Sequence, residues 1–349
     1  MRMTKFLAII VFILTGSIVS GQSILKDYFK GNKDSMLIEA SNLINLPEPA
    51  FKPFKPAKID ASTLAEMGFE QPNKAKNYYF IARDKKKLFA YQFQKKSPNT
   101  IILIHGVKTK AYFHNRMAGL LQKATQAEVF AIDLRGHGNS DGIDGDVDYI
   151  NQYADDLADI IKAIRKAKPN GKIIIAGHSM GGGVALNYAI QKNKMNVDGF
   201  LLFAPLIGNN SPAIPQTAPS PSDSIEPFMQ IHIARIIGLK MFNELNNHEH
   251  DNLPVLFFNL PENTPSRKYT YRANMSMAPE DYKEGLKAVN APMLVLIGNK
   301  DEAFNAEALK KAVIENSNGQ VQIIEGATHN GIRHDSEAYN FIKKWFSGL

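Results

Sequence analysis

The residues with the clearest chemical meaning are Gly177-His178-Ser179-Met180-Gly181, in which a serine stands between two glycines. An apolar run, 173–176, precedes this pentapeptide and an apolar-periodic segment, 184–189, follows it, so the sequence predicts a strand, a tight turn and a helix. Small residues beside the serine allow the strained backbone of such a turn, which pushes the hydroxyl outward. Ser179 is therefore the candidate nucleophile. A phosphate-binding glycine loop would instead need a lysine and a longer glycine spacing.

A serine nucleophile needs a histidine base and a carboxylate that orients the base. In doubly wound sheets the ligand binds at the carboxyl ends of the strands, so the residues directly after each apolar run are candidates. Asp301 follows the run 293–297, and His329 follows the run 321–324. We predict that His329 takes the Ser179 proton and that Asp301 fixes the tautomer of the imidazole. The chain order of serine, aspartate and histidine is the one that this serine turn requires.

Other interpretations of these residues stay open at this stage. Asp301 could instead cap the N-terminus of a helix, and His329 could be a packed loop histidine. Glu302 is a rival for the role of the acid. The rival bases are His105, which would ordinarily hold its loop, His137, which comes too early in the chain, and His334, which adjoins the predicted start of the last helix.

The loop His105-Gly106-Val107 follows the apolar run 101–104 and predicts an oxyanion hole. The glycine lets the N–H of Val107 point into the site, where it and the N–H of Met180 would bind a developing negative charge. Each such donor typically stabilises a transition state by about 3 to 4 kcal/mol.

A glycine-rich turn, 133–142, follows the apolar run 129–132, and Asp133 and Arg135 are expected to brace it beside the nucleophile. Four acids in and after this turn invite a calcium site, but their spacing misses the EF-hand loop. Acids are also expected before a helix that would start near Val147, because they complement the helix dipole. These acids are Asp141, Asp144, Asp146 and Asp148. We predict no metal site.

Short apolar runs alternate with amphipathic segments along most of the chain, which predicts a parallel sheet covered by helices on both faces. The predicted buried strands are 101–104, 129–132, 173–176, 200–204, 293–297 and 321–324. Two strand-like segments, 78–82 and 88–93, come before them and predict a hairpin. We therefore expect an α/β fold with a mostly parallel, eight-stranded sheet.

The interval 207–286 breaks this alternation with a proline-rich loop, an apolar-rich helical stretch over 228–245 and a strand-like run over 253–258. It is predicted to form a cap, inserted after the sixth strand. The other predicted parts are a signal peptide, 1–21, an irregular proline-containing extension, 22–76, that is draped over the domain, and a core made of 77–206 and 287–349.

The N-terminus has basic residues and then the apolar run 6–14, which is the layout of a secretory signal peptide cleaved near Gly21. We expect a secreted or periplasmic protein, with an uncleaved N-terminal membrane anchor as the alternative. The chain has no cysteine, so no thiolate can act as nucleophile or metal ligand. The formal net charge of +7 becomes +5 when Arg2 and Lys5 leave with the signal peptide (7 minus 2). Scattered lysines favour a weak attraction to anionic membrane surfaces over nucleic-acid binding.

Taken together, these residues show that the chain resembles the α/β-hydrolase superfamily, and within it the S33-type group of monoacylglycerol lipases, lysophospholipases and serine aminopeptidases. The resemblance covers the chain from about residue 77 to residue 349. It is carried by His105-Gly106, the segment 133–142, the pentapeptide 177–181, the segment 298–301 and His329-Asn330. It implies ester or thioester hydrolysis through an acyl-enzyme, with no metal or organic cofactor.

Three functions stay open. The first is a serine hydrolase of small-molecule acyl esters, such as monoacylglycerols or lysophospholipids. Apolar cap residues could hold the acyl chain, although packing within the cap explains them equally well; they are Phe228, Met229, Ile231, Ile233, Ile236, Ile237, Met241 and Phe242. The second is an aminopeptidase-like enzyme, which would need an acid for the substrate amine, such as Glu226, Glu244 or Glu249. The third, a binding protein without activity, is disfavoured because every triad position is filled.

Overall fold

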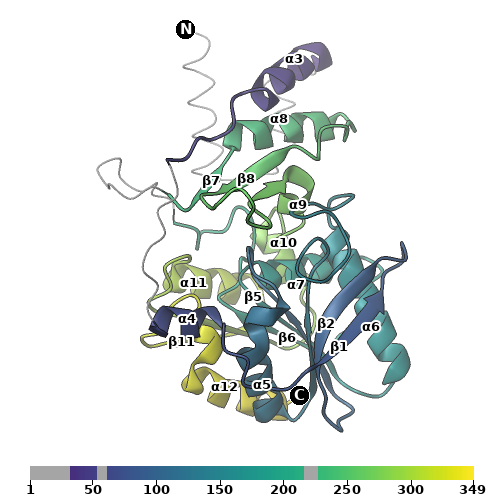
Figure 1. Ribbon diagram of the computed structural model, residues 1–349, viewed down its shortest axis with the longest axis vertical. Helices are drawn as coiled ribbons and strands as arrows, with labels where there is room; N and C mark the ends of the chain where they lie inside the picture. The colour runs from purple at the N-terminus through teal and green to yellow at the C-terminus, as the bar shows by residue number, and fades with distance from the viewer. Residues whose placement is uncertain (1–31, 53–60, 216–226) are drawn as a thin grey trace. The chain divides into compact units, whose positions relative to one another are not determined.

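The computed structural model describes residues 32–52, 61–215 and 227–349, which divide into two compact units (Figure 1). The larger unit contains the described residues 61–215 and 272–349, and the smaller unit contains 32–52 and 227–271. The predicted signal peptide lies outside the described residues. No helix in the described part of the chain is both long and apolar enough to cross a membrane.

An eight-stranded sheet forms the centre of the larger unit, in the order β1-β2-β4-β3-β5-β6-β10-β11. Strands β1 and β2 form an antiparallel hairpin, β2 pairs antiparallel with β4, and every other neighbouring pair is parallel. The strands are β1 (Lys76–Ile81), β2 (Lys87–Phe93), β3 (Thr100–Ile104), β4 (Glu128–Ile132), β5 (Ile173–His178), β6 (Gly199–Phe203), β10 (Met293–Gly298) and β11 (Gln320–Ile324). The predicted fold class, hairpin and strand positions are confirmed.

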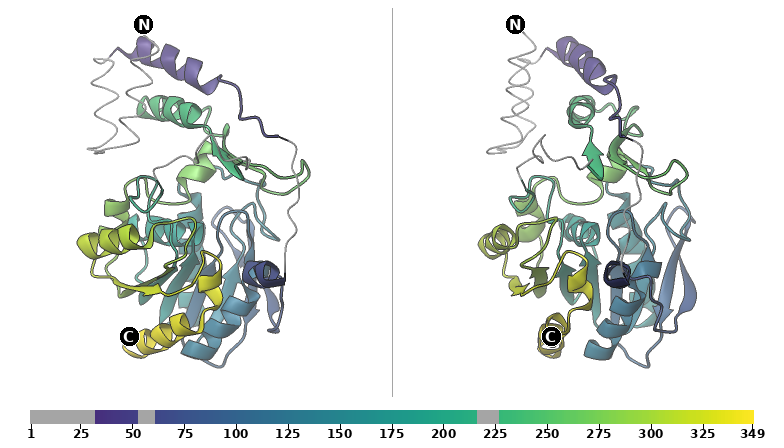
Figure 2. Two further views of the ribbon diagram at one scale, coloured as in Figure 1. Left: turned by 90° about the vertical axis from the view of Figure 1, so that its left-hand side faces the viewer. Right: turned by 60° about the vertical axis from the view of Figure 1, so that its left-hand side comes forward.

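Helices cover both faces of this sheet, which is why its middle strands are apolar at almost every position. Helices α5 (Asn115–Thr125) and α12 (Ser336–Ser347) lie side by side on one face, and α6 (Gln152–Ala167) packs with α7 (Met180–Ile190) on the other (Figure 1 and Figure 2). The remaining helices of the unit are α4 (Ala61–Met67), η1 (Ala111–His114), α10 (Tyr282–Lys287), α11 (Ala306–Asn316) and η2 (Gly331–His334). A short helix, α9 (Tyr271–Met275), begins at the boundary between the two units.

Helix α6 begins at Gln152, five residues later than predicted. The reason is that the acids before it bind other groups. Asp146 accepts the N–H of Val147 at 2.8 Å and forms an ion pair with Arg272 at 2.6 Å. The side chain of Gln152 accepts the N–H of Asp148 at 2.6 Å, which keeps the segment before the helix in a turn.

The smaller unit combines part of the N-terminal extension with part of the predicted cap. Its helix α3 (Lys33–Ile44) packs on α8 (Ile233–Glu244), and its antiparallel sheet contains β7 (Met229–Ile231), β8 (Pro254–Phe258) and β9 (Lys268–Thr270). Gly238 makes the helix contact close, because a Cβ there would lie 2.8 Å from the Ala40 carbonyl oxygen. The extension is therefore not irregular over 33–44, and the expected domain boundaries stay a prediction.

The predicted helix over 228–245 is wrong at its start. Residues 229–231 pair with β8 as strand β7, with Met229 opposite Phe258 and Ile231 opposite Leu256. His232 then ends the strand and caps the helix, since its Nδ1 accepts the N–H of Arg235 at 3.1 Å. The strand-like run over 253–258 is confirmed as β8.

Candidate active site

Ser179 lies in the sharp turn between β5 and α7, with φ 54° and ψ −118°. This backbone conformation is strained for a residue with a side chain and costs on the order of 1 to 3 kcal/mol. The turn is held by its own backbone: Ser179 donates to the Phe203 carbonyl at 3.0 Å, and its carbonyl accepts the N–H groups of Gly182 and Leu206, each at 3.0 Å. A Cβ at Gly181 would lie 2.3 Å from the Ile104 carbonyl oxygen, so the strand could not approach a larger residue.

Asp301 and His329 come together at the ends of β10 and β11. The imidazole Nδ1 lies 2.9 Å from one oxygen of the Asp301 carboxylate and 3.1 Å from the other. That carboxylate is fully buried and also accepts the N–H groups of Ala303 and Phe304, each at 2.8 Å. A carboxylate with these three donors is an acceptor, so Nδ1 carries the proton and Nε2 is left with a free lone pair. His329 is therefore oriented as a base.

Neither the helix-cap interpretation of Asp301 nor the rival acid Glu302 fits the contacts of this site. Helix α11 is capped by Asn305, whose side chain accepts the Ala308 N–H at 2.9 Å, so Asp301 is not the helix cap. Glu302 reaches the backbone and not the ring: its carboxylate accepts the N–H of His329 at 3.0 Å. Both acids therefore hold His329, but of the two only Asp301 is hydrogen-bonded to its imidazole.

His178, which the sequence reasoning did not single out, links the serine turn to the histidine loop. Its Nε2 lies 2.9 Å from the His329 carbonyl oxygen, and the two rings are 4.8 Å apart. Because a carbonyl only accepts, His178 Nε2 carries a proton and donates it. Burial holds the pKa of His178 well below its usual range, so the ring is neutral. Its position next to Ser179 in the pentapeptide was the available signal.

The hydrogen bond from His178, the residue before Ser179, thus connects the serine turn to the loop that carries His329. Within the described residues no hydrogen bond joins the Ser179 hydroxyl to the imidazole of His329. In structures without a substrate such catalytic hydrogen bonds are often long and tighten when the substrate binds.

The predicted oxyanion loop lies against the serine turn. A Cβ on Gly106 would be 3.3 Å from the Ser179 Cβ, which shows how close the two backbones come. The N–H of Val107 and the N–H of Met180 donate to no acceptor among the described residues. Met180 is the first residue of α7, where an N–H has no partner inside the helix. Neither group is occupied by an acceptor in the described residues, as an oxyanion hole would require.

The rival bases His105, His137 and His334 are buried or half-buried histidines near the site. His105 accepts the Leu134 N–H through Nε2 at 3.1 Å and donates from Nδ1 to the Gly106 carbonyl at 2.8 Å, so it fastens the oxyanion loop. Burial lowers the pKa of His105 and of His137 to about 4, and that of His334 to about 3. None of the three contacts Asp301 within the described part of the chain.

The turn 133–142 is braced as predicted. The carboxylate of Asp133 accepts the N–H groups of Ala111 at 2.6 Å and Asn139 at 2.8 Å. Arg135 is 2% exposed and pairs with Asp84 at 2.6 Å and Asp156 at 2.7 Å. Among residues 32–52, 61–215 and 227–349, no group of three or more His, Asp or Glu residues is arranged to hold a metal ion.

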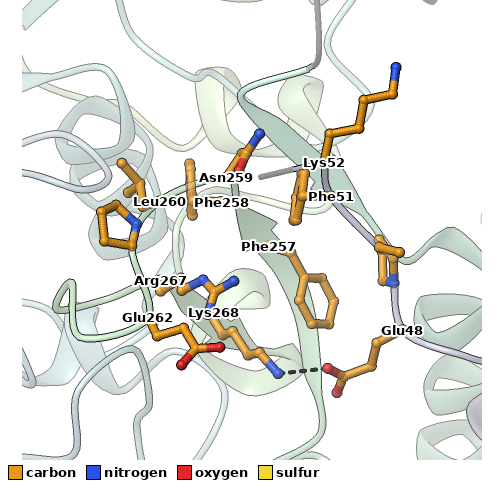
Figure 3. Close-up of a pocket in the computed structure, with 13 residues that line it drawn as sticks. Glu48, Phe51, Lys52, Phe257, Phe258, Asn259, Leu260, Glu262, Arg267 and Lys268 are labelled. Carbon is orange, nitrogen blue, oxygen red and sulfur yellow. Dashed lines mark hydrogen bonds and ion pairs between the residues drawn. The ribbon is translucent and has the colours of Figure 1, made fainter. Parts of the chain in front are cut away.

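Each unit contains a surface hollow. The hollow in the smaller unit, of about 470 Å³, lies between residues 48–52 and the strands β8 and β9, and Lys268 and Glu48 form an ion pair across it at 2.6 Å (Figure 3). The hollow in the larger unit, of about 300 Å³, lies between α4 and the loop that carries His329. Thr328 and Glu66 line the second hollow, and they are bonded to each other at 3.0 Å.

Comparison with known proteins places this arrangement among hydrolases. The family model described as serine aminopeptidase, S33, matches residues 95–337. A putative esterase/lipase of Mycoplasma genitalium is 25% identical over 264 residues, covering 71% of this chain and 88% of that protein. The monoglyceride lipase of Rattus norvegicus is 29% identical over 112 residues, covering 32% of this chain and 36% of the enzyme. Among solved structures, an esterase of Pyrococcus furiosus has the same fold, with a TM-score of 0.53, 16% identity and coverage of 86% of this chain and 98% of the esterase.

Proposed function

Since the chain belongs to the serine aminopeptidase S33 family of α/β hydrolases, we propose that it is a serine hydrolase that cleaves carboxylic esters through an acyl-enzyme. The observation that carries this proposal is the buried contact of 2.9 Å between Asp301 and His329, formed beside the strained turn of Ser179. Val107 and Met180 supply the two free N–H groups that such a reaction needs.

In the first half of the proposed reaction, the Ser179 hydroxyl oxygen attacks the ester carbonyl carbon. His329 Nε2 takes the hydroxyl proton, and the carbonyl electrons move to the oxygen, which the Val107 and Met180 N–H groups bind. The Asp301 carboxylate stabilises the imidazolium while it is charged. The tetrahedral intermediate then collapses, the bond to the alcohol oxygen breaks, and His329 gives its proton to the departing alcohol.

In the second half a water molecule replaces the alcohol. His329 removes a proton from the water as the water oxygen attacks the acyl carbon, and the same N–H groups bind the second oxyanion. When this intermediate collapses, Ser179 leaves with the proton from His329, and the carboxylic acid is released. Every proton is returned within the cycle, so the residues need no cofactor to balance it.

The smaller unit presents exposed apolar side chains. Helix α8 packs on α3, and its residues Ile237, Met241 and Phe242 are buried. The apolar residues that precede this helix stay exposed, with Phe228 56% and Ile231 47% accessible. The lipase and esterase names of relatives support a monoacyl lipid or a similar ester as the substrate. Export through the N-terminal segment remains part of the same prediction.

The test uses nitrophenyl esters of graded chain length and aminoacyl nitroanilides. We expect the wild-type protein to turn over the esters and a fluorophosphonate to label Ser179 covalently. Both should be lost in Ser179→Ala, in which kcat should fall by at least about 10³-fold. The unfolding midpoints of the wild-type protein and of Ser179→Ala should agree, because the substitution removes only one hydroxyl. Inertness to esters together with the absence of labelling would refute the proposal, and a preference for nitroanilides would make the enzyme a peptidase.

A further inference from the structure

Helix α4 lies outside the family match, which begins at residue 95, yet it contacts the loop that carries His329 (α4 is dark blue in Figure 1). Glu66 makes two bonds to this loop. Its carboxylate accepts the Thr328 hydroxyl at 3.0 Å, and its backbone carbonyl accepts a guanidinium N–H of Arg333. One residue of the extension therefore holds the loop on both sides of His329.

The two loop residues pass this restraint on to their neighbours. The Thr328 hydroxyl oxygen also accepts the Gly331 N–H at 2.9 Å, which closes the turn that begins at His329. Arg333 is 1% exposed and donates a further bond to the Asn330 carbonyl at 3.1 Å. The carboxylate and the backbone carbonyl of Glu66 thus fix the curvature of the loop through Thr328 and Arg333.

The residues that follow Glu66 are themselves packed against the rest of the larger unit. A Cβ on Gly68 would lie 2.0 Å from the Phe113 carbonyl oxygen, and the Phe69 and Phe113 rings meet edge to face with centroids 5.0 Å apart. Gln71 donates to the Tyr112 carbonyl at 2.9 Å. The segment that carries Glu66 therefore has little freedom to move with the loop.

The position of His329 is then determined from four directions. Asp301 holds the ring, Glu302 holds the backbone N–H, and His178 holds the backbone carbonyl. The fourth restraint is the pair formed by Glu66 and Thr328. Misplacement of a reacting group by about 1 Å can cost on the order of 10²-fold in rate.

We propose that Glu66 is a positioning residue for the reaction: through Thr328 and Arg333 it sets the place of the His329 imidazole relative to Ser179. The proposal rests on the function proposed above. It gives the segment 61–71 of the N-terminal extension a part in turnover, although no atom of Glu66 needs to touch the substrate.

The experiment compares Glu66→Ala, Glu66→Gln, Thr328→Val and Thr328→Ser in the full chain. We expect Glu66→Ala and Thr328→Val to lower kcat for a nitrophenyl ester by about 10- to 100-fold, with KM changed less than about twofold. Glu66→Gln and Thr328→Ser keep the acceptor and the hydroxyl, so they should recover most of the rate. Glu70→Ala is the matched control, because it removes a nearby exposed acid that pairs only loosely, at 3.8 Å, with Arg116.

A second measurement does not depend on turnover. The proton on His329 Nδ1, held by Asp301, should give a downfield NMR signal that Glu66→Ala and Thr328→Val shift or broaden, and that Glu70→Ala leaves in place. If the wild-type protein is inert to esters, the proposed function fails while this signal still tests the positioning. Folded Glu66→Ala and Thr328→Val proteins with unchanged kcat and an unchanged signal would overturn the inference.

Discussion

The two described pieces of the N-terminal extension are each fastened by a buried arginine, but the two arginines have different partners. In the smaller unit, Arg235 donates to the Ile44 and Pro254 carbonyls and forms an ion pair with Glu48 at 3.3 Å. In the larger unit, Arg333 donates to backbone carbonyls and, within the described residues, has no carboxylate at ion-pair distance. Burial lowers the pKa of Arg333 to about 10.

The two arginines therefore differ in what they contribute: one mainly stabilises its unit, and the other mainly positions a loop. A buried cation with a carboxylate partner offsets part of its desolvation cost, whereas one without such a partner carries more of that cost. The costly arrangement is the one beside the candidate site, where it orients a loop. The neutralised arrangement is the one that attaches 44–48 to α8. We infer that the larger unit gives up stability for the geometry of the loop that carries His329.

The largest expected effect comes from removing the charge that orients His329. Asp301→Asn should lower kcat by about 10⁴-fold, because an amide can present its N–H₂ to Nδ1 and stabilise the wrong tautomer. Ester turnover and the thermal unfolding midpoint would be measured together. A fall in kcat of less than tenfold would mean that Asp301 does not orient the base.

Acid should destabilise the larger unit next most strongly. His105 and His137 are buried with a pKa of about 4, against an ordinary value near 6.5. The unfolded chain therefore binds more protons between about pH 6.5 and pH 4, so the free energy of unfolding falls as the pH is lowered through this window. The loss at pH 4 is on the order of 3 kcal/mol for each histidine.

Urea unfolding at a series of pH values measures this slope. His137→Asn is the matched variant: it should be less stable at neutral pH, and it should lose less stability on acidification than the wild-type protein. An equal slope in the two proteins would show that His137 does not account for the acid sensitivity.

The smallest expected effect concerns the smaller unit. Arg235→Met leaves the carbonyls of Ile44 and Pro254 without their donor, so we expect a loss of about 2 kcal/mol in the free energy of unfolding. The chemical step on a short soluble ester should keep its rate. Hydrogen exchange would show faster exchange in α3 and α8 than in the sheet of the larger unit. Glu48→Gln removes the carboxylate that pairs with Arg235 at 3.3 Å and with Lys268 at 2.6 Å, so it should also destabilise the smaller unit, but less than Arg235→Met does, because the Glu48 side chain is 40% exposed. A larger effect than that of Arg235→Met would reverse the ranking.

The sheet and most of the candidate site were predictable because each depends on a local pattern. Strands β3, β4, β5, β6 and β10 are buried along their length and mostly apolar, and the candidate site residues follow directly after them. Asp301 and His329 could be paired from their places at neighbouring strand ends. The structure brings them within hydrogen-bond distance, at 2.9 Å.

The remainder depends on contacts between residues far apart in the chain. Helix α3 buries only Met36, Ala40, Leu43 and Ile44, and its partner α8 begins 200 positions after α3 begins (233 minus 33), so nothing local marks the pairing. The bond from Glu66 to Thr328 spans 262 positions. Helix α6 begins late because Asp146 pairs with Arg272, an interaction that periodicity does not reveal.

The composition of the smaller unit has a consequence for protein engineering. Because α3 and residues 44–48 are built into the same unit as α8 and β8, this unit is not encoded as a single insertion. Exchanging it with the corresponding unit of another protein would require two segments to be transferred together, 32–52 and 227–271. A graft limited to the second segment would carry an apolar helix face and a buried arginine without the residues that cover them.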